Sequence, residues 1–352
     1  MELDVLNGYK GVIPLNHHPD FSKQGYQVIS ELGRNREGGR ITYLANVLNS
    51  NQQVVIKEFS FARASADLSG VKTYEREIEI LQQLNHSRIP RYIDSFEMLG
   101  DFYLVQEYKN APSLGLRRNF HPEEIKQIAL SILEILVYLQ KQVPPIIHRD
   151  IKPENILVDE QLNAYLVDFG LARIQGAKIA LSSFVTGTPG FMPPEEQFGH
   201  SLTEASDLYS LGATLICLLT NTRSVEIGKL IDENYRFNFQ KLVPQISPRF
   251  RSWLMRMVEC KRKRRYVNAS FALKALRPIE VVGTANGIDT LVSTIKPRKR
   301  ATVLGLATVV TLVAVGTTLM SCQPDDPVRQ LLEATECQSF YLNSSCQEKT
   351  GH

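Results

Sequence analysis

The sequence predicts an α+β chain with a small β-rich part that contains one helix, a larger and mainly helical part, and one membrane-spanning helix. Up to about Asn110, short β-branched and aromatic runs alternate with turn residues, which is the pattern of antiparallel strands. Beyond Asn110, longer apolar stripes recur at helical spacing. Residues 301–320 form an apolar run of 20 positions without a charge, about the length of a helix that crosses a bilayer.

The β-rich part begins after an irregular leader, residues 1–25, that has Gly, Pro, His and Asn but no sustained periodicity. One helix is expected over residues 72–84, with Tyr74, Ile78, Leu81 and either Leu84 or Ile80 on its apolar face. The expected strands are YQVISEL (26–32), RITYLANV (40–47), QVVIKEF (53–59), RYIDSFEML (91–99) and FYLVQEY (102–108).

The helical part opens with a helix over residues 122–141, because Pro122 suits a helix start and a wide apolar stripe follows it. Further helices are expected over residues 207–219, 249–258 and 269–276. Residues 279–300 then form a linker that ends in the basic run KPRKR.

The apolar run at 301–320 predicts a single membrane span. A buried core helix is the alternative, but it would need polar positions at a regular spacing, and the run offers only threonines. The basic cluster before the run places the preceding part in the cytoplasm and the short tail, 321–352, outside it. The first ten residues lack the apolar stretch of a secretory signal. Cys337 and Cys346 of the tail could pair in an oxidising compartment, and the sequence leaves this open.

Composition excludes several classes of function. A formal net charge of +3 on 352 residues is too small to indicate nucleic-acid binding. The five cysteines show no Cys-x-x-Cys spacing, so neither a zinc site nor a redox motif is expected.

Two strings in the helical part carry chemistry. His148 to Asn155 reads HRDIKPEN, and Asp168-Phe169-Gly170 follows it. Over residues 26–278 the chain resembles the eukaryotic-type (Hanks-type) serine/threonine protein kinases of bacteria, since order and spacing match the catalytic-loop and DFG motifs. The resemblance implies a two-lobed protein kinase fold, with a small lobe at 26–107 and a large lobe at 110–278.

The resemblance also implies ATP and Mg²⁺, with Mn²⁺ as an alternative ion, and gives roles to four residues. Asp150 would orient the substrate hydroxyl, and Lys152 would place a positive charge near the transferred phosphoryl group. Asn155 and Asp168 would supply oxygen ligands to the metal, which as a hard cation prefers them. Asp and Asn often merely cap helices or shape turns, but the ordered set favours catalysis.

Upstream, Val54 to Lys57 resembles the strand that carries the phosphate-binding lysine. Its carboxylate partner would be Glu77, preferred over Glu75 and Glu79 because it holds the glutamate position of the family pattern. At the hinge, Glu107, Tyr108 and Lys109 would offer backbone groups to adenine.

The glycine-rich loop departs from the family pattern. It begins at Gly33, has Asn35 at the middle glycine, and ends at Gly38 or Gly39. Asparagine tolerates positive φ, so a turn over phosphates remains feasible, and a simple hairpin turn is the alternative.

The segment GTPGFMPPE (187–195) resembles the Ser/Thr-type substrate-docking segment. Thr188 would contact Asp150 and Lys152. Glu195 would form a buried ion pair with Arg265, or failing that with Arg264. Asp207 would hold the catalytic-loop backbone.

Hydroxyl residues between Asp168 and Glu195 suggest regulation by autophosphorylation in membrane-associated signalling. A phosphate there could pair with Arg149 and Arg173 and order the segment. The candidate acceptors are Ser182, Ser183, Thr186 and Thr188. Expected partners are protein substrates with Ser or Thr acceptors, the lipid bilayer and a second copy of the chain, but no nucleic acid.

Two other functions fit the sequence less well. A pseudokinase scaffold would have lost Lys57, Asp150, Asn155 or Asp168, and all four are present. A small-molecule phosphotransferase would not need the segment 187–195.

Overall fold

A computed structural model describes residues 18–35, 40–50, 52–60, 69–116, 119–175 and 188–282. These residues form two compact units. Among the described residues, the first unit comprises those up to Ala111 together with Tyr165–Ala172, and the second comprises Pro112–Ala164 together with those from Arg173 to Val282. The chain therefore returns to the β-rich unit with the short segment that carries Asp168, a return that the linear sequence did not indicate.

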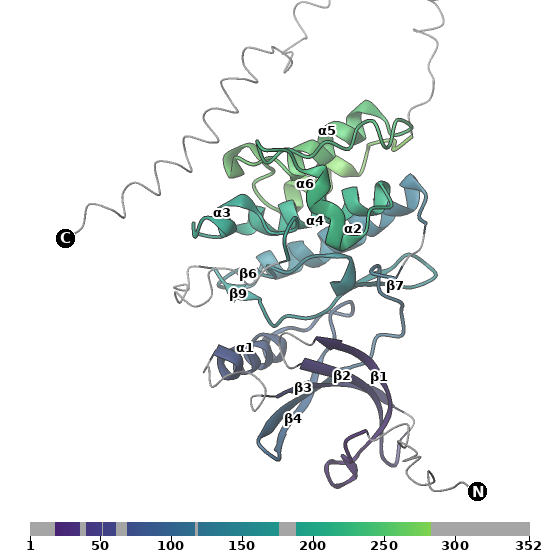
Figure 1. The fold of residues 1–352 in the computed structure, drawn as a ribbon, viewed down its shortest axis with the longest axis vertical. Helices are drawn as coiled ribbons and strands as arrows, with labels where there is room; N and C mark the ends of the chain where they lie inside the picture. The colour runs from purple at the N-terminus through teal and green to yellow at the C-terminus, as the bar shows by residue number, and fades with distance from the viewer. Residues whose placement is uncertain are drawn as a thin grey trace, which may run out of the picture. The chain divides into compact units, whose positions relative to one another are not determined.

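The first unit is built on an antiparallel sheet of five strands in the order β1-β2-β3-β5-β4 (Figure 1). All five segments that were expected as strands are strands here, with ends shifted by up to three residues. Their bounds are β1 Tyr26–Asn35, β2 Arg40–Val47, β3 Gln53–Phe59, β4 Tyr92–Met98 and β5 Asp101–Glu107.

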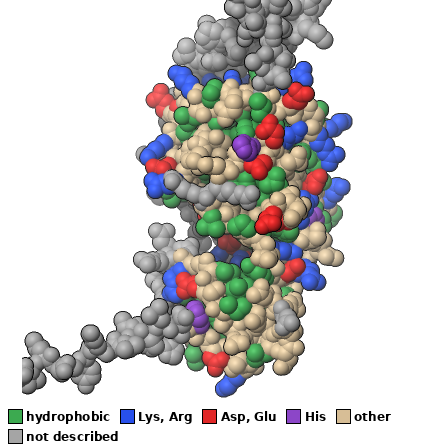
Figure 2. Space-filling model, turned by 90° about the vertical axis from the view of Figure 1, so that its right-hand side faces the viewer, with side chains coloured by type: hydrophobic (Ala, Val, Ile, Leu, Met, Phe, Trp, Pro, Cys, Tyr) green, Lys and Arg blue, Asp and Glu red, His purple; other side chains and the backbone are tan. Residues whose placement is uncertain are grey.

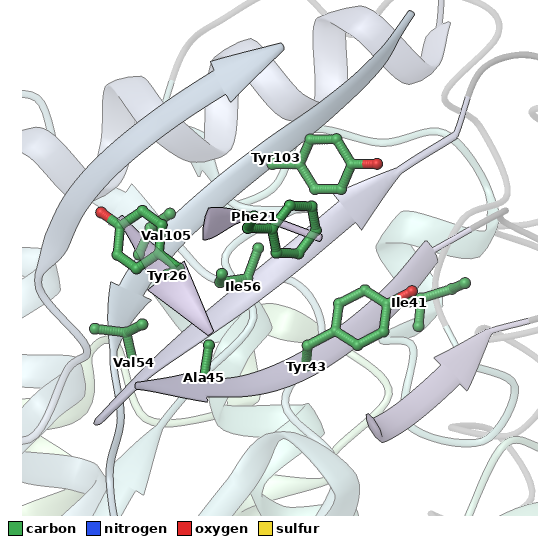
Figure 3. Packing of buried hydrophobic residues seen from close by; sticks show 9 residues of the cluster. All are labelled: Phe21, Tyr26, Ile41, Tyr43, Ala45, Val54, Ile56, Tyr103 and Val105. Carbon is green, nitrogen blue, oxygen red and sulfur yellow. The ribbon is translucent and has the colours of Figure 1, made fainter. Parts of the chain in front are cut away.

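Aromatic and aliphatic side chains of these strands pack into one core cluster, shown in Figure 3. Phe21 belongs to it although the residue precedes the sheet. Its ring lies 4.9 Å from that of Tyr103, edge to face, and it is 1% exposed. A short 3₁₀ helix, η1 (Ser22–Gln24), connects it to β1. The end of the expected leader is therefore part of the core of the unit.

Helix α1 (Ser69–Gln83) is the one helix of this unit that the sequence predicted. Its buried side chains include Tyr74, Ile80 and Leu81. Glu77 is fully buried, whereas Ile78, which was expected on the apolar face, is only half-buried. The carboxylate of Glu77 can be buried on this helix because it has a charged partner there, as described below.

The second unit is mainly helical. Helix α2 packs against α4 and α6, and α4 packs against α5. The helices are α2 Pro122–Gln140, α3 Pro194–Gln197, α4 Glu204–Leu219, α5 Pro248–Met257 and α6 Ala269–Leu276. The four predicted helices are present with ends within three residues, but α3, a single turn of four residues, was not predicted.

Short strands and 3₁₀ turns connect these helices. β6 (Ile146–Ile147) pairs with β9 (Arg173–Ile174) and leads directly into His148. The remaining elements are η2 Pro153–Asn155, β7 Ile156–Val158, β8 Ala164–Leu166, η4 Ser224–Leu230 and η5 Arg262–Arg264.

The surface of the described residues fits the small net charge. On the face shown in Figure 2, basic and acidic side chains alternate with apolar ones on the helical unit. No helix among the described residues, which end at residue 282, is long and apolar enough to cross a membrane. The predicted span at 301–320, the tail 321–352 and most of the linker lie outside the described residues.

Candidate active site

The β-rich unit holds a buried cluster of charges around Lys57. Strand β3 places Lys57 opposite α1, and its Nζ donates to Oε1 of Glu77 at 2.5 Å. The same Nζ donates to Oδ1 of Asp168 at 3.2 Å. The side chains of Lys57 and Glu77 are 7% and 0% exposed. Three residues that lie far apart in the sequence thus meet in one place.

Burial by itself would lower the pKa of Lys57, but the charges of Asp168 and Glu77 more than offset it and raise that pKa above its ordinary value. Lys57 therefore carries its proton at neutral pH. A buried ammonium of this kind can neutralise phosphate charge.

The structure adds a second cation to this cluster that the sequence did not indicate. Arg40, the first residue of β2, donates from Nη1 to Oδ1 of Asp168 at 3.1 Å, and its guanidinium lies 4.9 Å from the ring centre of Phe59. No local motif marks Arg40, because its role depends on a contact across 128 positions.

Gly170 leaves little room for a side chain beside these groups, so a Cβ there would need one of them to shift slightly. A Cβ at Gly170 would lie 3.0 Å from Oε2 of Glu77 and 3.1 Å from the guanidinium of Arg40. Asp168 has φ +64°, a conformation that costs energy for a residue other than glycine.

The helical unit holds the second cluster, around Asp150. Asn155 donates from Nδ2 to the main-chain oxygen of Asp150 at 2.8 Å and to its Oδ2 at 2.7 Å. Lys152 Nζ lies 2.8 Å from Oδ2 of Asp150 and donates to Oγ1 of Thr188 at 2.8 Å. The Thr188 hydroxyl donates to Oδ1 of Asp150 at 3.3 Å. Both oxygens of Asp150 are therefore oriented by neighbours.

Asp207 of α4 holds the backbone on which Asp150 stands. Its two carboxylate oxygens accept from the amides of His148 at 2.8 Å and Arg149 at 2.9 Å. Burial raises the pKa of Asp207 to about 6, although the two amide donors oppose this shift. Arg149 has φ +70°, so an unfavourable backbone conformation is fixed beside Asp150.

Two adjacent acids of α3 pair with two arginines. Glu195 accepts two parallel hydrogen bonds from Arg265, each at 2.7 Å, and the structure thus pairs it with Arg265 rather than with Arg264. Glu196 accepts from Nε of Arg149 at 2.8 Å. The sequence did not indicate Glu196 as a site residue, since its only local mark is that it is a second acid directly after Glu195.

The remaining sequence candidates are placed as follows. Gly33 lies in β1 beside a register shift, opposite Thr42. The Glu107 carboxylate pairs with Lys109 at 2.7 Å and with Arg91 at 3.2 Å. The side chains of Glu107 and Lys109 therefore form an ion pair with each other. The main-chain oxygen of Lys109 accepts from the amide of Ala111. Gly38, Gly39, Ser182, Ser183 and Thr186 lie outside the described residues.

Asn155 and Asp168, the residues expected to bind a divalent cation, each have a side-chain oxygen suited to that role. The side-chain nitrogen of Asn155 donates to Asp150, and among the described residues its side-chain oxygen accepts no hydrogen bond. Asp168 presents a carboxylate, 30% exposed, between two cations. Amide and carboxylate oxygens are the hard donors that Mg²⁺ selects.

The comparisons with known proteins agree with this chemistry. Residues 26–274 match the family model described as "Protein kinase domain". The chain is 32% identical over 302 residues to serine/threonine-protein kinase D of Synechocystis, covering 79% of this chain and 59% of that one. It is 33% identical over 273 residues to serine/threonine-protein kinase B of the same organism, covering 71% and 46%.

A plant relative, a probable LRR receptor-like serine/threonine-protein kinase of Arabidopsis thaliana, is 32% identical over 244 residues, covering 66% of this chain and 24% of that one. The chain thus spans between about a quarter and three-fifths of the length of these relatives. The matched region contains both clusters of charged residues. The chain belongs to the protein kinase domain family.

Proposed function

We propose that this protein is a serine/threonine protein kinase that transfers the γ-phosphate of ATP to hydroxyl groups of protein substrates. The observation that carries the proposal is the geometry around Asp150, where a carboxylate is held by Lys152, Asn155 and Thr188 in one cluster. Each relative compared above is named a serine/threonine-protein kinase, which supports the same activity here.

Phosphoryl transfer depends on positioning and on neutralising charge. Asp150 is placed to accept a hydrogen bond from a substrate hydroxyl and to take its proton. Lys152, beside it, supplies a positive charge for the phosphoryl group in transfer. Lys57, kept charged by Glu77 and Asp168, would neutralise phosphate oxygens of ATP. Asn155 and Asp168 each offer an oxygen suited to Mg²⁺, an ion that would supply further positive charge to the phosphates.

The contact between Lys152 and Thr188 supports the proposed preference for Ser and Thr. This contact joins the catalytic loop to the segment that would dock the substrate peptide. Both residues also contact the carboxylate of Asp150, to which an acceptor hydroxyl would bind.

The test is incubation of the full chain with γ-labelled ATP, Mg²⁺ and a generic basic protein, followed by phosphoamino-acid analysis. We expect label on Ser and Thr and not on Tyr. The Lys57→Met variant should lose at least about 100-fold in rate, because phosphate charge is then unneutralised. Label confined to Tyr would refute the Ser/Thr assignment, and no label from the wild type would refute the activity.

Three finer proposals accompany the activity. The uncharged run at 301–320 and the basic residues before it support a membrane anchor with the kinase domain in the cytoplasm. The hydroxyl residues at 182–186 support autophosphorylation of that segment, which phosphopeptide mapping of the full chain would locate. A single anchoring helix would also allow a second copy to associate in the membrane during signalling.

A further inference from the structure

The guanidinium of Arg149 is neutralised inside the helical unit. Its Nε and Nη2 both donate to Oε1 of Glu196, at 2.8 and 2.5 Å. The two side chains are only 2% and 5% exposed. Arg149 directly precedes Asp150, so the pair lies one residue away from the proposed catalytic carboxylate. A buried guanidinium requires an anion, and Glu196 supplies it from the chain itself.

The pair does not use its full hydrogen-bonding capacity. Nη1 of Arg149 and Oε2 of Glu196 are buried and have no hydrogen-bond partner among the described residues. The two donors converge on one oxygen instead of forming the parallel pair that Arg265 makes with Glu195. Burial raises the pKa of Glu196, and the charge of Arg149 opposes this without cancelling it. The contact is held by its surroundings more than by ideal geometry.

Those surroundings anchor α3 through contacts with residues that follow it in the sequence. Glu195 is bound by Arg265 and accepts from the hydroxyl of Ser206 at 2.9 Å. Its main-chain oxygen accepts from the amide of His200 at 2.7 Å. All of these partners follow residue 194 in the sequence. These contacts fix α3, and with it Glu196.

Arg149 is held at both ends. Its amide donates to Asp207 at 2.9 Å, and its guanidinium is bound by Glu196. Since φ at Arg149 is +70°, the residue needs such contacts to keep its conformation. Because Asp150 is the next residue, its position depends on this backbone conformation.

We propose that Glu196 is a positioning residue for the phosphoryl transfer proposed above, on which this inference rests: by binding Arg149 it keeps Asp150 in place without a phosphate in the 182–186 segment. Phosphorylation of that segment is then a product of activity and not a condition for it. A phosphate on the 182–186 segment was expected to pair with Arg149. The positive charge of Arg149 is already neutralised by Glu196.

The test compares the full-length wild type with Glu196→Gln, which keeps the size of the side chain and removes its charge. We expect kcat on a protein substrate to fall by about tenfold or more, as expected for a misplaced catalytic group. The KM for ATP should stay within about twofold, because Glu196 touches no group assigned to the nucleotide. Glu123→Gln, an exposed change on α2, is the matched control and should leave both constants unchanged.

A double-variant cycle separates positioning from a general loss of structure. If Glu196 acts through Arg149, the variant Arg149→Gln/Glu196→Gln should be no slower than Arg149→Gln alone, because the second change removes nothing further. Fully additive losses in kcat would overturn the proposal. So would an unchanged kcat in a folded Glu196→Gln variant.

A second measurement needs no variant and remains decisive if Glu196→Gln does not fold. The wild type is treated with phosphatase, its dephosphorylation is checked by mass spectrometry, and initial rates are measured before label reappears on the enzyme. Retention of at least about half of the rate supports the proposal. A loss of tenfold or more that is restored by autophosphorylation overturns it while leaving the kinase activity intact, whereas an inactive wild type overturns the proposed function itself.

Discussion

Three buried acids of the helical unit differ in the direction in which their surroundings shift the carboxyl pKa. Glu195 has its pKa lowered, because Arg265 more than offsets the effect of burial. Glu196 and Asp207 have theirs raised, because burial dominates over one arginine or two amides. The difference follows from how fully each carboxylate is bonded to charged donors. Both oxygens of Glu195 accept from Arg265, whereas Oε2 of Glu196 has no partner among the described residues and Asp207 accepts from uncharged amides.

Asp207 gives a prediction on pH. Its pKa is about 6 in the folded chain and ordinarily 3.8, so the folded state binds its proton more tightly. Its stabilising contribution is present below pH 3.8 and is lost as pH rises through about 6. We expect the wild type to lose roughly 2 to 3 kcal/mol of unfolding free energy over this range through this group. Asp207→Asn should remove that decline.

Urea unfolding of the full chain at several pH values between 4 and 7 checks this. The exposed Glu123→Gln variant should keep the slope of the wild type. An Asp207→Asn variant that follows the wild type at every pH would contradict the assignment of the shifted group.

Arg265→Met tests the ion pair with Glu195. The change leaves a buried carboxylate without its cation, and we expect a loss of about 3 to 5 kcal/mol in unfolding free energy. Arg264→Met, an exposed neighbour, should cost less than about 0.5 kcal/mol. Denaturant titration of both variants measures the two losses in unfolding free energy. Equal losses would contradict a specific role of Arg265 in the ion pair with Glu195.

Residues in contiguous motifs could be placed from the sequence, whereas those defined by distant contacts could not. Asp150, Lys152 and Asn155 lie within six positions of one another, and the structure joins them by direct contacts. Arg40 and Glu196 reach their partners across 128 and 47 positions. Nothing local distinguishes them from other charged surface residues, so only the folded chain identifies them.

At the scale of elements, periodicity predicted the strands and the long helices because each buries one face. Within α1 it misplaced one residue, Ile78, which is only half-buried, whereas the expected Tyr74 and Leu81 are buried. It also failed for α3, since a helix of four residues is too short to show a period. The burial of Phe21 was missed because one aromatic residue in an irregular segment has no pattern.

The packing of α4 against α5 gives an element-scale prediction. A Cβ at Gly212 would lie 2.7 Å from Cβ of Met257 and from Cγ1 of Val258. Alanine favours a helix by about 1 kcal/mol over glycine, but overpacking of this kind costs about 1 to 3 kcal/mol. We expect Gly212→Ala to be destabilising overall.

The matched control is Gly228→Ala, because a Cβ there meets no atom within 4 Å. Unfolding midpoints in urea should fall for Gly212→Ala and stay within error for Gly228→Ala. A stabilised Gly212→Ala variant would mean that the two helices separate easily enough to accommodate a methyl group.

At the scale of the whole molecule, the proposed anchor can be tested apart from catalysis. The full chain should remain with the membrane pellet after alkaline extraction. A Val309→Arg/Val310→Arg variant should move to the supernatant, because each central arginine opposes insertion by about 2.5 to 3.5 kcal/mol. Thr308→Ser is the control. Release of the wild type by alkaline extraction would rule out a spanning segment.

Each unit contributes one charged cluster to the proposed reaction, and the central claim is that Asp150 is its catalytic carboxylate. The most direct measurement is transfer of γ-labelled phosphate to a protein substrate by the full-length wild type, by Asp150→Asn and by Asp159→Asn as a control away from the clusters. Transfer by Asp150→Asn should fall at least about 1,000-fold with ATP binding retained, since the group that accepts the proton is lost, while Asp159→Asn should match the wild type. Equal transfer by Asp150→Asn and the wild type would contradict the account.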